Sequence, residues 1–267
     1  MDDIGFDGEI PENYDRYLGP ILFSPYADDL ADRLPAGLED VLELACGTGI
    51  LTRRLLNRLQ TAARLISTDL SPQMLEYAEG RVGLSDRVQW RQADAAALPF
   101  PDAAFDAVVC QFGVMFFPDK LAAMKGARRV LRPGRSFLFN VWGSLEDNDL
   151  AWVADRSLRE LFSDDPPGFL SVPHGYHEPG VIRSVLEEAG FQDVGVVEVA
   201  RRIKGAPARD YAAGVINGSP IRRWLQERGE TDFDGLIDRL ADRIGQECGD
   251  PTHDARMSAI IVTAASR

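Results

Sequence analysis

The sequence predicts an α/β protein built on a doubly wound sheet, in one domain that spans residues 1–267. Segments with the apolar pattern of strands alternate six times with segments that carry helical spacing, and a seventh strand segment ends the chain. The first strand segment breaks at a glycine-bearing turn, residues 46–49, directly before a helix. Sheets of this kind bind nucleotide-like ligands at the carboxyl ends of their strands, where helix N-termini present free N–H groups.

The composition is that of a soluble globular protein, with 45% apolar and 27% charged residues in a chain of 267. Twenty-nine basic and 42 acidic residues give a formal net charge of −13, which repels polyphosphate and disfavours a nucleic-acid substrate. The three cysteines lack zinc-ligand spacing, no leader-like segment opens the chain, and no apolar run approaches about 18 residues. We therefore expect a cytoplasmic protein with reduced thiols and no membrane span.

The elements of the sheet can be assigned in order from apolar periodicity, caps and breakers. Residues 1–40 form an N-terminal helical cover, with one or two helices between Tyr14 and Leu34 that could close a ligand site. We expect strands from residue 41 into the glycine turn and at 63–69, 88–94, 105–110, 136–142, 194–203 and 257–264. We expect helices at 50–59, from Ser71-Pro72 onward, at 121–131 with a closing turn at 132–134, and at 179–189.

Two stretches lie outside the predicted core of residues 41–142 and are predicted to be lid insertions over a substrate. Residues 143–178 are irregular with several proline breakers, whereas residues 205–255 are mostly helical and acidic. Both follow strands, so they leave the sheet at its ligand-binding edge. Their aromatic residues are suited to an apolar pocket wall, although each could instead pack the insertion onto the sheet: Trp152, Phe162, Phe169, Tyr176, Tyr211 and Trp224.

Four motifs in the core resemble those of the class I S-adenosylmethionine-dependent methyltransferases. Residues 43–49, ELACGTG, are similar to the first motif, E/D-x-x-x-G-x-G, with Ala45 where many members have another glycine. Residues 69–75 resemble the motif after the second strand, and Asp94-Ala95 resemble the one after the third. Residues 98–110, LPFPDAAFDAVVC, are similar to the approach to the fourth strand, and the core as a whole resembles ubiquinone/menaquinone methyltransferases.

The resemblance implies a Rossmann-like, seven-stranded, mostly parallel sheet whose antiparallel last strand lies beside the sixth. It also implies S-adenosyl-L-methionine as the cofactor, with Met74 as an apolar wall and Asp94-Ala95 at the adenine edge. Asp69 follows Gly49 by 20 residues, the offset at which a carboxylate reaches ribose hydroxyls in such sites. The full set of expected cofactor-binding residues is Glu43, Ala45, Gly47, Gly49, Asp69, Leu70, Met74, Asp94, Ala95 and Gln111.

The predicted activity is transfer of a methyl group from S-adenosylmethionine to a small-molecule acceptor by in-line displacement. This chemistry requires no fixed catalytic constellation, and we assign no catalytic residue and no metal site. Residues 165–168, DPPG, resemble an amino-methyltransferase motif but lie too far from the fourth strand, so we interpret them as a turn. His174 and His177 could act as a base or bind a metal, but a flexible loop with incidental histidines is the favoured interpretation.

Two alternatives remain open on the sequence alone. A non-catalytic protein that binds S-adenosylmethionine would keep all the same motifs. An NAD-type oxidoreductase is disfavoured because Thr52 stands where the dinucleotide fingerprint requires glycine. The acceptor, the methylated atom and the oligomeric state are not determined by the sequence.

Overall fold

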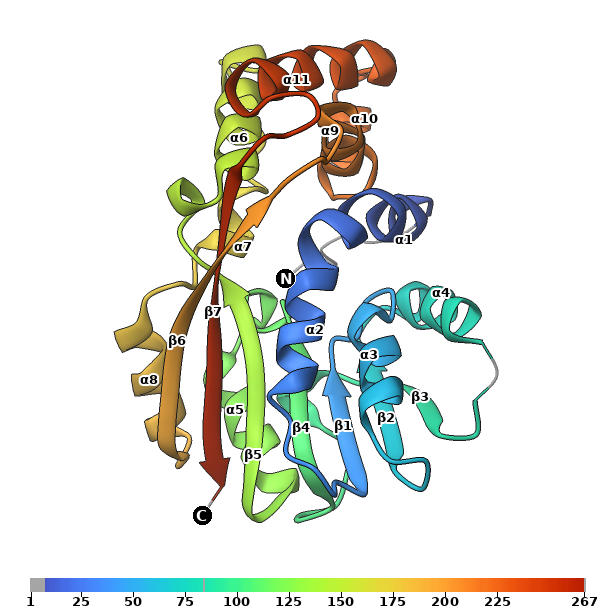
Figure 1. The fold of residues 1–267 in the computed structure, drawn as a ribbon, viewed down its shortest axis with the longest axis vertical. Coiled ribbons are helices and arrows are strands. Elements are labelled where there is room, and N and C mark those ends of the chain that lie inside the picture. Colours follow the sequence, from blue (N-terminus) through green and yellow to red (C-terminus); the bar gives the residue numbers. More distant parts are fainter. Residues whose placement is uncertain (1–7, 84, 267) are drawn as a thin grey trace.

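The sheet has seven strands in the order β3-β2-β1-β4-β5-β7-β6 (Figure 1), in a computed structural model that describes residues 8–83 and 85–266. The strands are β1 (Asp40–Leu44), β2 (Arg64–Asp69), β3 (Val88–Gln92), β4 (Phe105–Gln111), β5 (Leu131–Trp142), β6 (Gln192–Ile203) and β7 (Ala255–Ser266). Strand β7 runs antiparallel to both β5 and β6, and the pairs among β1 to β5 are parallel. This confirms the predicted sheet with its antiparallel last strand.

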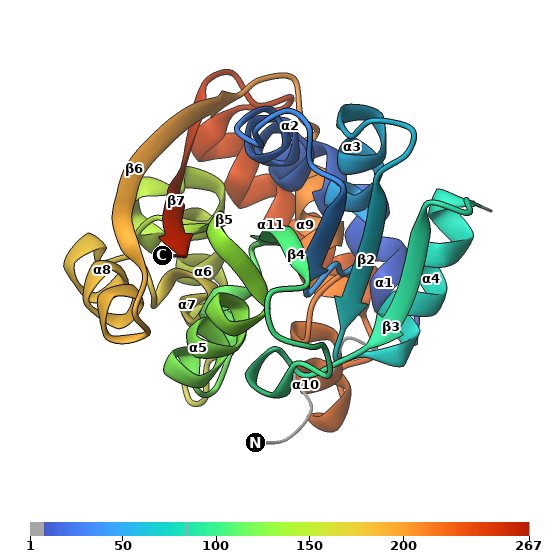
Figure 2. The same cartoon turned by 90° about the horizontal axis from the view of Figure 1, so that it is seen from below.

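Helices cover both faces of the sheet. Figure 2 shows α2 and α3 on one face and α5 and α8 on the other. The α-helices are α1 (Ile10–Asn13), α2 (Ser24–Asp32), α3 (Ile50–Arg58), α4 (Pro72–Val82), α5 (Lys120–Val130), α6 (Asp149–Leu161), α7 (Ser171–His174), α8 (Pro179–Glu188), α9 (Ala208–Asn217), α10 (Ile221–Glu227) and α11 (Phe233–Cys248). Between α1 and α2 the chain forms a ten-residue π-helix, η1 (Tyr14–Phe23), with Pro20 inside it. The predicted cap is confirmed at α4, where the Ser71 hydroxyl accepts a hydrogen bond from the N–H of Met74.

A separate group of helices lies beyond the carboxyl edge of the sheet, at the top of Figure 1. We call α6, α9, α10 and α11 the helical cap. Helices α9 and α11 confirm the helical prediction for 205–255, but α6 lies in the segment that was expected to be irregular. That expectation was wrong because α6 buries Leu150, Val153 and Leu158 at helical spacing, which the proline breakers further along obscured.

A second correction concerns the start of β5. The expected turn at residues 132–134 lies inside this strand, which begins directly after α5 at Leu131. Leu131 pairs with Phe105, and the register then shifts before Ala107 pairs with Ser136. The Pro-Gly sequence therefore lies within β5 at this register shift, and no separate turn connects α5 to the strand.

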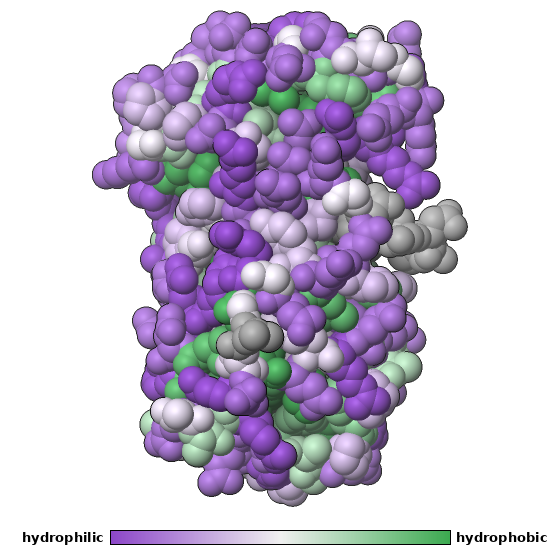
Figure 3. All heavy atoms as spheres, turned by 90° about the vertical axis from the view of Figure 1, so that its right-hand side faces the viewer, coloured by the Kyte–Doolittle hydropathy of each residue, from purple (hydrophilic) through white to green (hydrophobic). Residues whose placement is uncertain are grey.

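The core joins the N-terminal helices to the far side of the sheet. Tyr26 of α2 is fully buried, and its hydroxyl donates to the carbonyls of Val199 on β6 and Met257 on β7. The surface seen in Figure 3 is mostly hydrophilic, with small apolar patches separated by polar side chains. Among the described residues, no helix combines the length and apolar character needed to cross a bilayer.

A substitution at Gly49 would test the backbone geometry of the turn after β1. Its φ is +78°, and an added Cβ would lie 3.2 Å from both the Ala78 Cβ and the Val82 Cγ2 of α4. We expect Gly49→Ala to lower the free energy of unfolding by about 1–3 kcal/mol in urea titrations. Gly80→Ala is the matched control in an open position of α4, and it should stabilise the protein by up to about 1 kcal/mol. Equal effects of the two substitutions would contradict this account.

Candidate functional site

A cavity opens at the carboxyl edge of the sheet, where the strand order reverses between β1 and β4. After β1 the chain turns through Ala45, Gly47 and Gly49, whose φ values of +49°, +54° and +78° keep the backbone close to the edge. This sheet-edge cavity encloses about 1340 Å³ of space that protein atoms leave free, part of it open to solvent. Its place at the switch point is where open α/β sheets bind nucleotide-like ligands.

Asp69 ties together the two turns that border the sheet-edge cavity. Its Oδ2 accepts a hydrogen bond from the N–H of Gly47 at 2.9 Å, and its Oδ1 accepts one from the N–H of Ser71 at 2.9 Å. Burial raises the pKa of this carboxyl, against the effect of these backbone donors. Since each carboxylate oxygen has a second lone pair, both can still accept from a ligand hydroxyl.

The sheet-edge cavity is lined by eight of the ten residues that the motifs selected: Ala45, Gly47, Asp69, Leu70, Met74, Asp94, Ala95 and Gln111. Leu70 is 65% exposed and offers apolar surface to the cavity. Asp94 also caps a short turn by accepting from the N–H of Ala96 at 2.8 Å. Gln111 donates from its Nε2 to the carbonyl of Phe23 at 2.8 Å, which anchors the end of η1 at the sheet edge.

The other two selected residues, Glu43 and Gly49, do not line the cavity. Glu43 is 1% exposed beneath the turn, and its Oε2 accepts from the hydroxyls of Thr52 at 2.6 Å and Ser67 at 2.7 Å. Gly49 lies against α4, as described above. Both were predicted to be cofactor-binding residues, and the structure places Glu43 beneath the turn and Gly49 against α4.

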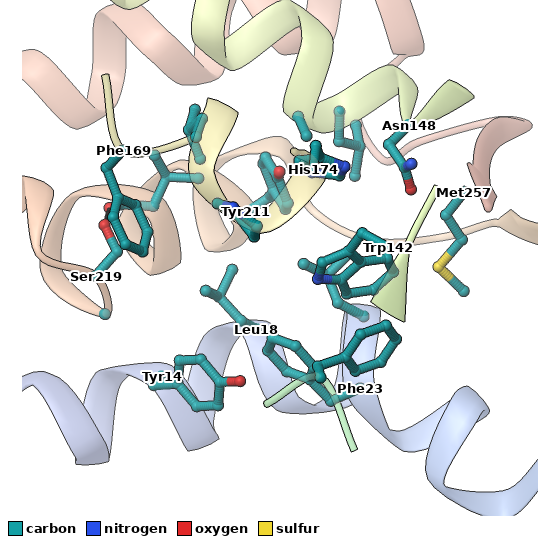
Figure 4. A pocket seen from close by; sticks show the side chains of 18 of the residues that line it. Tyr14, Leu18, Phe23, Trp142, Asn148, Phe169, His174, Tyr211, Ser219 and Met257 are labelled. Atoms are coloured by element: carbon teal, nitrogen blue, oxygen red, sulfur yellow. Dashed lines mark hydrogen bonds between the residues drawn. The ribbon is translucent and has the colours of Figure 1, made fainter. Parts of the chain in front are cut away.

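A second cavity lies between η1 and the helical cap, and Figure 4 shows its lining. This cap cavity encloses about 770 Å³, including space open to solvent. Tyr14, Leu18 and Phe23 rise from the N-terminal helix, while Phe169, His174 and Tyr211 approach from the insertions (Figure 4). The lining is mostly aliphatic and aromatic, which is typical of pockets for small organic ligands.

The two cavities share one wall of four aromatic side chains, Tyr14, Phe23, Phe112 and Phe116. Phe112 stacks on Trp142 with ring centroids 3.9 Å apart and packs edge-on against Phe23. Its φ of +49° is unusual for a bulky residue, and its N–H donates to the backbone and side-chain oxygens of Asn140 at 3.1 and 3.0 Å. Strain of this kind is characteristic of functional sites, where the surrounding structure holds a side chain in place.

Of the six aromatic residues proposed for the pocket wall, Phe169 and Tyr211 line the cap cavity. The other four pack elsewhere, which is the alternative that the sequence left open for each of them. Phe162 and Trp224 contact each other edge-on at 5.1 Å, and the ring of Tyr176 lies under the ammonium of Lys120. Trp152 lies beside Arg156 and borders a groove together with the end of α11.

Sequence reasoning missed Trp142 and misjudged His174. His174 was expected in a flexible loop, but it is 7% exposed on α7 and lines the cap cavity. Trp142 was recognised only as the end of a strand. A signal for it existed, because the last residue of a parallel strand projects at the ligand-binding edge.

The helix that carries the shared wall is held by a buried carboxylate. Asp15 accepts from the Thr48 hydroxyl and the Arg53 guanidinium at 3.1 Å each, and from the Arg81 guanidinium at 3.2 Å. Thr48 belongs to the turn after β1, Arg53 to α3 and Arg81 to α4. One side chain thereby holds η1 against three other segments that lie around the sheet-edge cavity.

Comparison with known proteins agrees with this geometry. Residues 41–134 match the model of a family described as a methyltransferase domain. An uncharacterised protein of Mycobacterium tuberculosis is 41% identical over 120 residues, which are 44% of this chain and 39% of that protein. The ubiquinone/menaquinone biosynthesis C-methyltransferase UbiE of Pseudomonas syringae is 29% identical over 184 residues, 61% of this chain and 72% of that enzyme.

Among solved structures, phosphoethanolamine N-methyltransferase 2 of Haemonchus contortus, in complex with phosphomonomethylethanolamine and S-adenosylhomocysteine, superposes with a TM-score of 0.61 at 18% identity. The match covers 96% of this chain and 56% of that one, and at this identity it concerns the fold alone. This chain spans about two fifths of the length of the mycobacterial relative, so the similarity there is confined to one part of that protein.

The buried Glu43 carboxyl makes the stability of the protein depend on pH. Burial raises the pKa of its carboxyl to about 7, from 4.5, and the hydrogen bonds from Thr52 and Ser67 offset only part of this. Because the folded state binds the proton more tightly, Glu43 makes the free energy of unfolding fall as pH rises from about 4.5 to about 7. The whole effect is about 3 kcal/mol.

We expect Glu43→Gln to remove this contribution, so that urea unfolding at pH 5 and pH 8 gives a smaller difference in the variant than in the wild type. The exposed Glu39→Gln is the matched control and should keep the wild-type difference. A Glu43→Gln variant with the wild-type pH dependence would show that Glu43 is ionised throughout.

Proposed function

Because the chain belongs to the class I S-adenosylmethionine-dependent methyltransferases, we propose that it methylates a small-molecule acceptor bound in the cap cavity. The observation that carries this proposal is the pair of adjoining cavities with one aromatic wall. A donor in the sheet-edge cavity and an acceptor in the cap cavity would meet at Tyr14, Phe23, Phe112 and Phe116. In-line transfer needs direct contact between the acceptor atom and the methyl group, so the two bound molecules would meet at an opening bordered by these four rings.

The residues of the sheet-edge cavity fit S-adenosylmethionine. Asp69 has lone pairs free for the ribose diol, and Leu70 and Met74 offer apolar surface for adenine. Asp94 and Ala95 lie at the same edge and offer a carboxylate and a backbone N–H for the adenine amino group and ring nitrogen. When bound, S-adenosylmethionine supplies a methyl group made electrophilic by its sulfonium.

The chain's own contribution is alignment and exclusion of water. The stacked Phe112 and Trp142 form a flat, rigid surface next to the junction, and the anchored η1 covers it. A rigid wall can hold an acceptor atom in line with the methyl group, which is the main requirement of a displacement of this type. The mostly apolar lining of the cap cavity keeps out water that would compete with the acceptor.

We assign acceptor choice to the two insertions, 143–178 and 205–255. Ala151, Phe169 and Tyr211 of these segments line the cap cavity, and none of them reaches the sheet-edge cavity. The helical cap also packs on η1 through α9, so it contributes to the stability of the cover over both cavities. Single substitutions are therefore a better test of this assignment than removal of an insertion.

The first test of the proposed function is at Asp69. Asp69→Ala removes charge-assisted hydrogen bonds to the ribose, and we expect it to weaken S-adenosylmethionine binding roughly ten- to hundredfold in calorimetry. It should also lower the free energy of unfolding by about 1–2 kcal/mol, because the N–H groups of Gly47 and Ser71 lose their acceptor. Binding of S-adenosylmethionine with unchanged affinity in this variant would remove the assignment, and absence of binding by the wild type would overturn the proposed function.

The second test separates the acceptor site from the cofactor site. Ala151 faces the cap cavity from α6, and a leucine there would occupy space meant for the acceptor. With an acceptor found by following S-adenosylhomocysteine release over a panel, Ala151→Leu should reduce turnover roughly ten- to hundredfold. Affinity for S-adenosylmethionine should stay the same, and Ala151→Gly, which leaves the cavity open, should retain turnover. Full activity of Ala151→Leu would exclude the cap cavity as the acceptor site.

A further inference from the structure

His174 has one ring nitrogen engaged by the protein and the other directed away from that bond. Its Nδ1 lies 2.9 Å from the carbonyl oxygen of Gly143. Since a carbonyl only accepts hydrogen bonds, Nδ1 carries the hydrogen and Nε2 carries a lone pair. In the described parts of the chain no donor is directed at Nε2, and the ring borders the cap cavity.

The sheet fixes the orientation of this ring. Gly143 follows the last residue of β5, and its own N–H donates to the carbonyl of Ser258 on β7 at 2.9 Å. The imidazole also lies beside the indole of Trp142, with ring centroids 6.0 Å apart. His174 is therefore held by rigid backbone although it lies in an insertion, and its Nε2 presents an acceptor in a defined direction.

The lining of the cap cavity carries almost no charge. Among the described residues that line the cap cavity, Arg256 alone is charged, and its guanidinium is paired with Asp149 at 3.2 Å and Asp147 at 3.7 Å. Asn148 and Ser219 use their side-chain polar atoms on backbone groups. A carboxylate or an ammonium group would enter this cavity without an available counter-charge, at a considerable desolvation cost.

We propose that His174 is a specificity-determining residue whose Nε2 accepts a hydrogen bond from a hydroxyl or N–H group of an uncharged, planar, largely apolar acceptor. This inference rests on the proposed function for the identity of the cavity as an acceptor site. The flat Phe112 and Trp142 rings favour a planar molecule, and the oriented Nε2 favours one that carries a donor. The hydroxyls of Tyr14 and Tyr211 belong to the same lining. The proposal concerns binding and orientation of the acceptor, without transfer of its proton.

The neutral state of the His174 imidazole favours a role in binding the acceptor over a role as a general base. Burial lowers the pKa of the imidazole to about 4, with the nearby His177 acting in the same direction, while the Gly143 carbonyl, Asp155 and Glu146 act in the opposite one. The ring is thus neutral at physiological pH and is a poor proton acceptor. A neutral imidazole remains a good hydrogen-bond acceptor.

The test uses two probes of nearly equal shape, 1-naphthol and naphthalene, with the wild-type protein saturated with S-adenosylhomocysteine. Their binding can be followed by calorimetry or by quenching of tryptophan fluorescence, since Trp142 lines the cavity. We expect 1-naphthol to bind roughly three- to tenfold more tightly than naphthalene, the effect of one net hydrogen bond. The charged probes 1-naphthoate and 1-naphthylmethylammonium should bind more weakly than 1-naphthol.

His174→Phe keeps a flat ring but removes Nε2, and it should abolish the preference for 1-naphthol. His253→Phe, an exposed position outside the cap cavity, is the matched control and should keep the preference. If S-adenosylhomocysteine binds to the wild type but the two neutral probes bind equally, the inference about His174 is wrong and the proposed function stands. If S-adenosylhomocysteine does not bind to the wild type, the proposed function itself fails. The comparison of probes on the wild type decides the matter even if His174→Phe does not fold.

Discussion

The buried carboxylate of Asp15 is the interaction on which both cavities depend. It accepts hydrogen bonds from Thr48, Arg53 and Arg81, and so joins η1 to the turn after β1, to α3 and to α4. A buried charge with three donors is compensated, whereas loss of the carboxylate would leave two guanidinium groups without their partner. Because η1 supplies Tyr14 and Phe23 to both cavities, the position of this one helix sets the shape of each.

Close backbone approach is the second constraint at the sheet edge. An added Cβ at Gly113 would lie 2.6 Å from the Ala45 Cβ and 2.8 Å from the Cys110 Sγ, so the chain after β4 passes directly against the turn after β1. Phe112, which precedes Gly113, has a positive φ, and its ring lines both cavities. The aromatic wall that the two cavities share is therefore made by local backbone geometry together with the anchored η1.

The region that matches the methyltransferase family and the region that lines the sheet-edge cavity are largely the same part of the chain. The methyltransferase family model matches residues 41–134, which contain β1 to β4 and most of the sheet-edge cavity. The cap cavity draws mainly on segments before and after this region, including η1, α6, α7 and α9. The sheet-edge cavity therefore lies mostly inside the matched region, and the cap cavity lies mostly outside it.

The sequence by itself determined the sheet, its order along the chain and most of the sheet-edge cavity. These features depend on short-range signals: apolar runs, glycines at 47 and 49, a capping serine at 71, and acidic residues at strand ends. Each signal lies next to the element that it specifies, so spacing alone places Asp69 and Asp94 at the same edge. The limits of this reasoning appear at Glu43, where a motif residue supports the turn from beneath and does not line the cavity.

Which residues form the cap cavity was decided only by the tertiary structure. Its wall brings Tyr14, Trp142, His174, Tyr211 and Met257 together from segments that are far apart in the chain, and no local pattern marks such a meeting. Whether an aromatic residue of the cap faces the cavity or the interior of the cap depends on how α6, α9 and α11 pack on one another. The bond from His174 to Gly143 likewise exists only because α7 returns to the end of β5. Such contacts are fixed by the burial of apolar faces across the whole fold, which the order of residues within any one segment does not reveal.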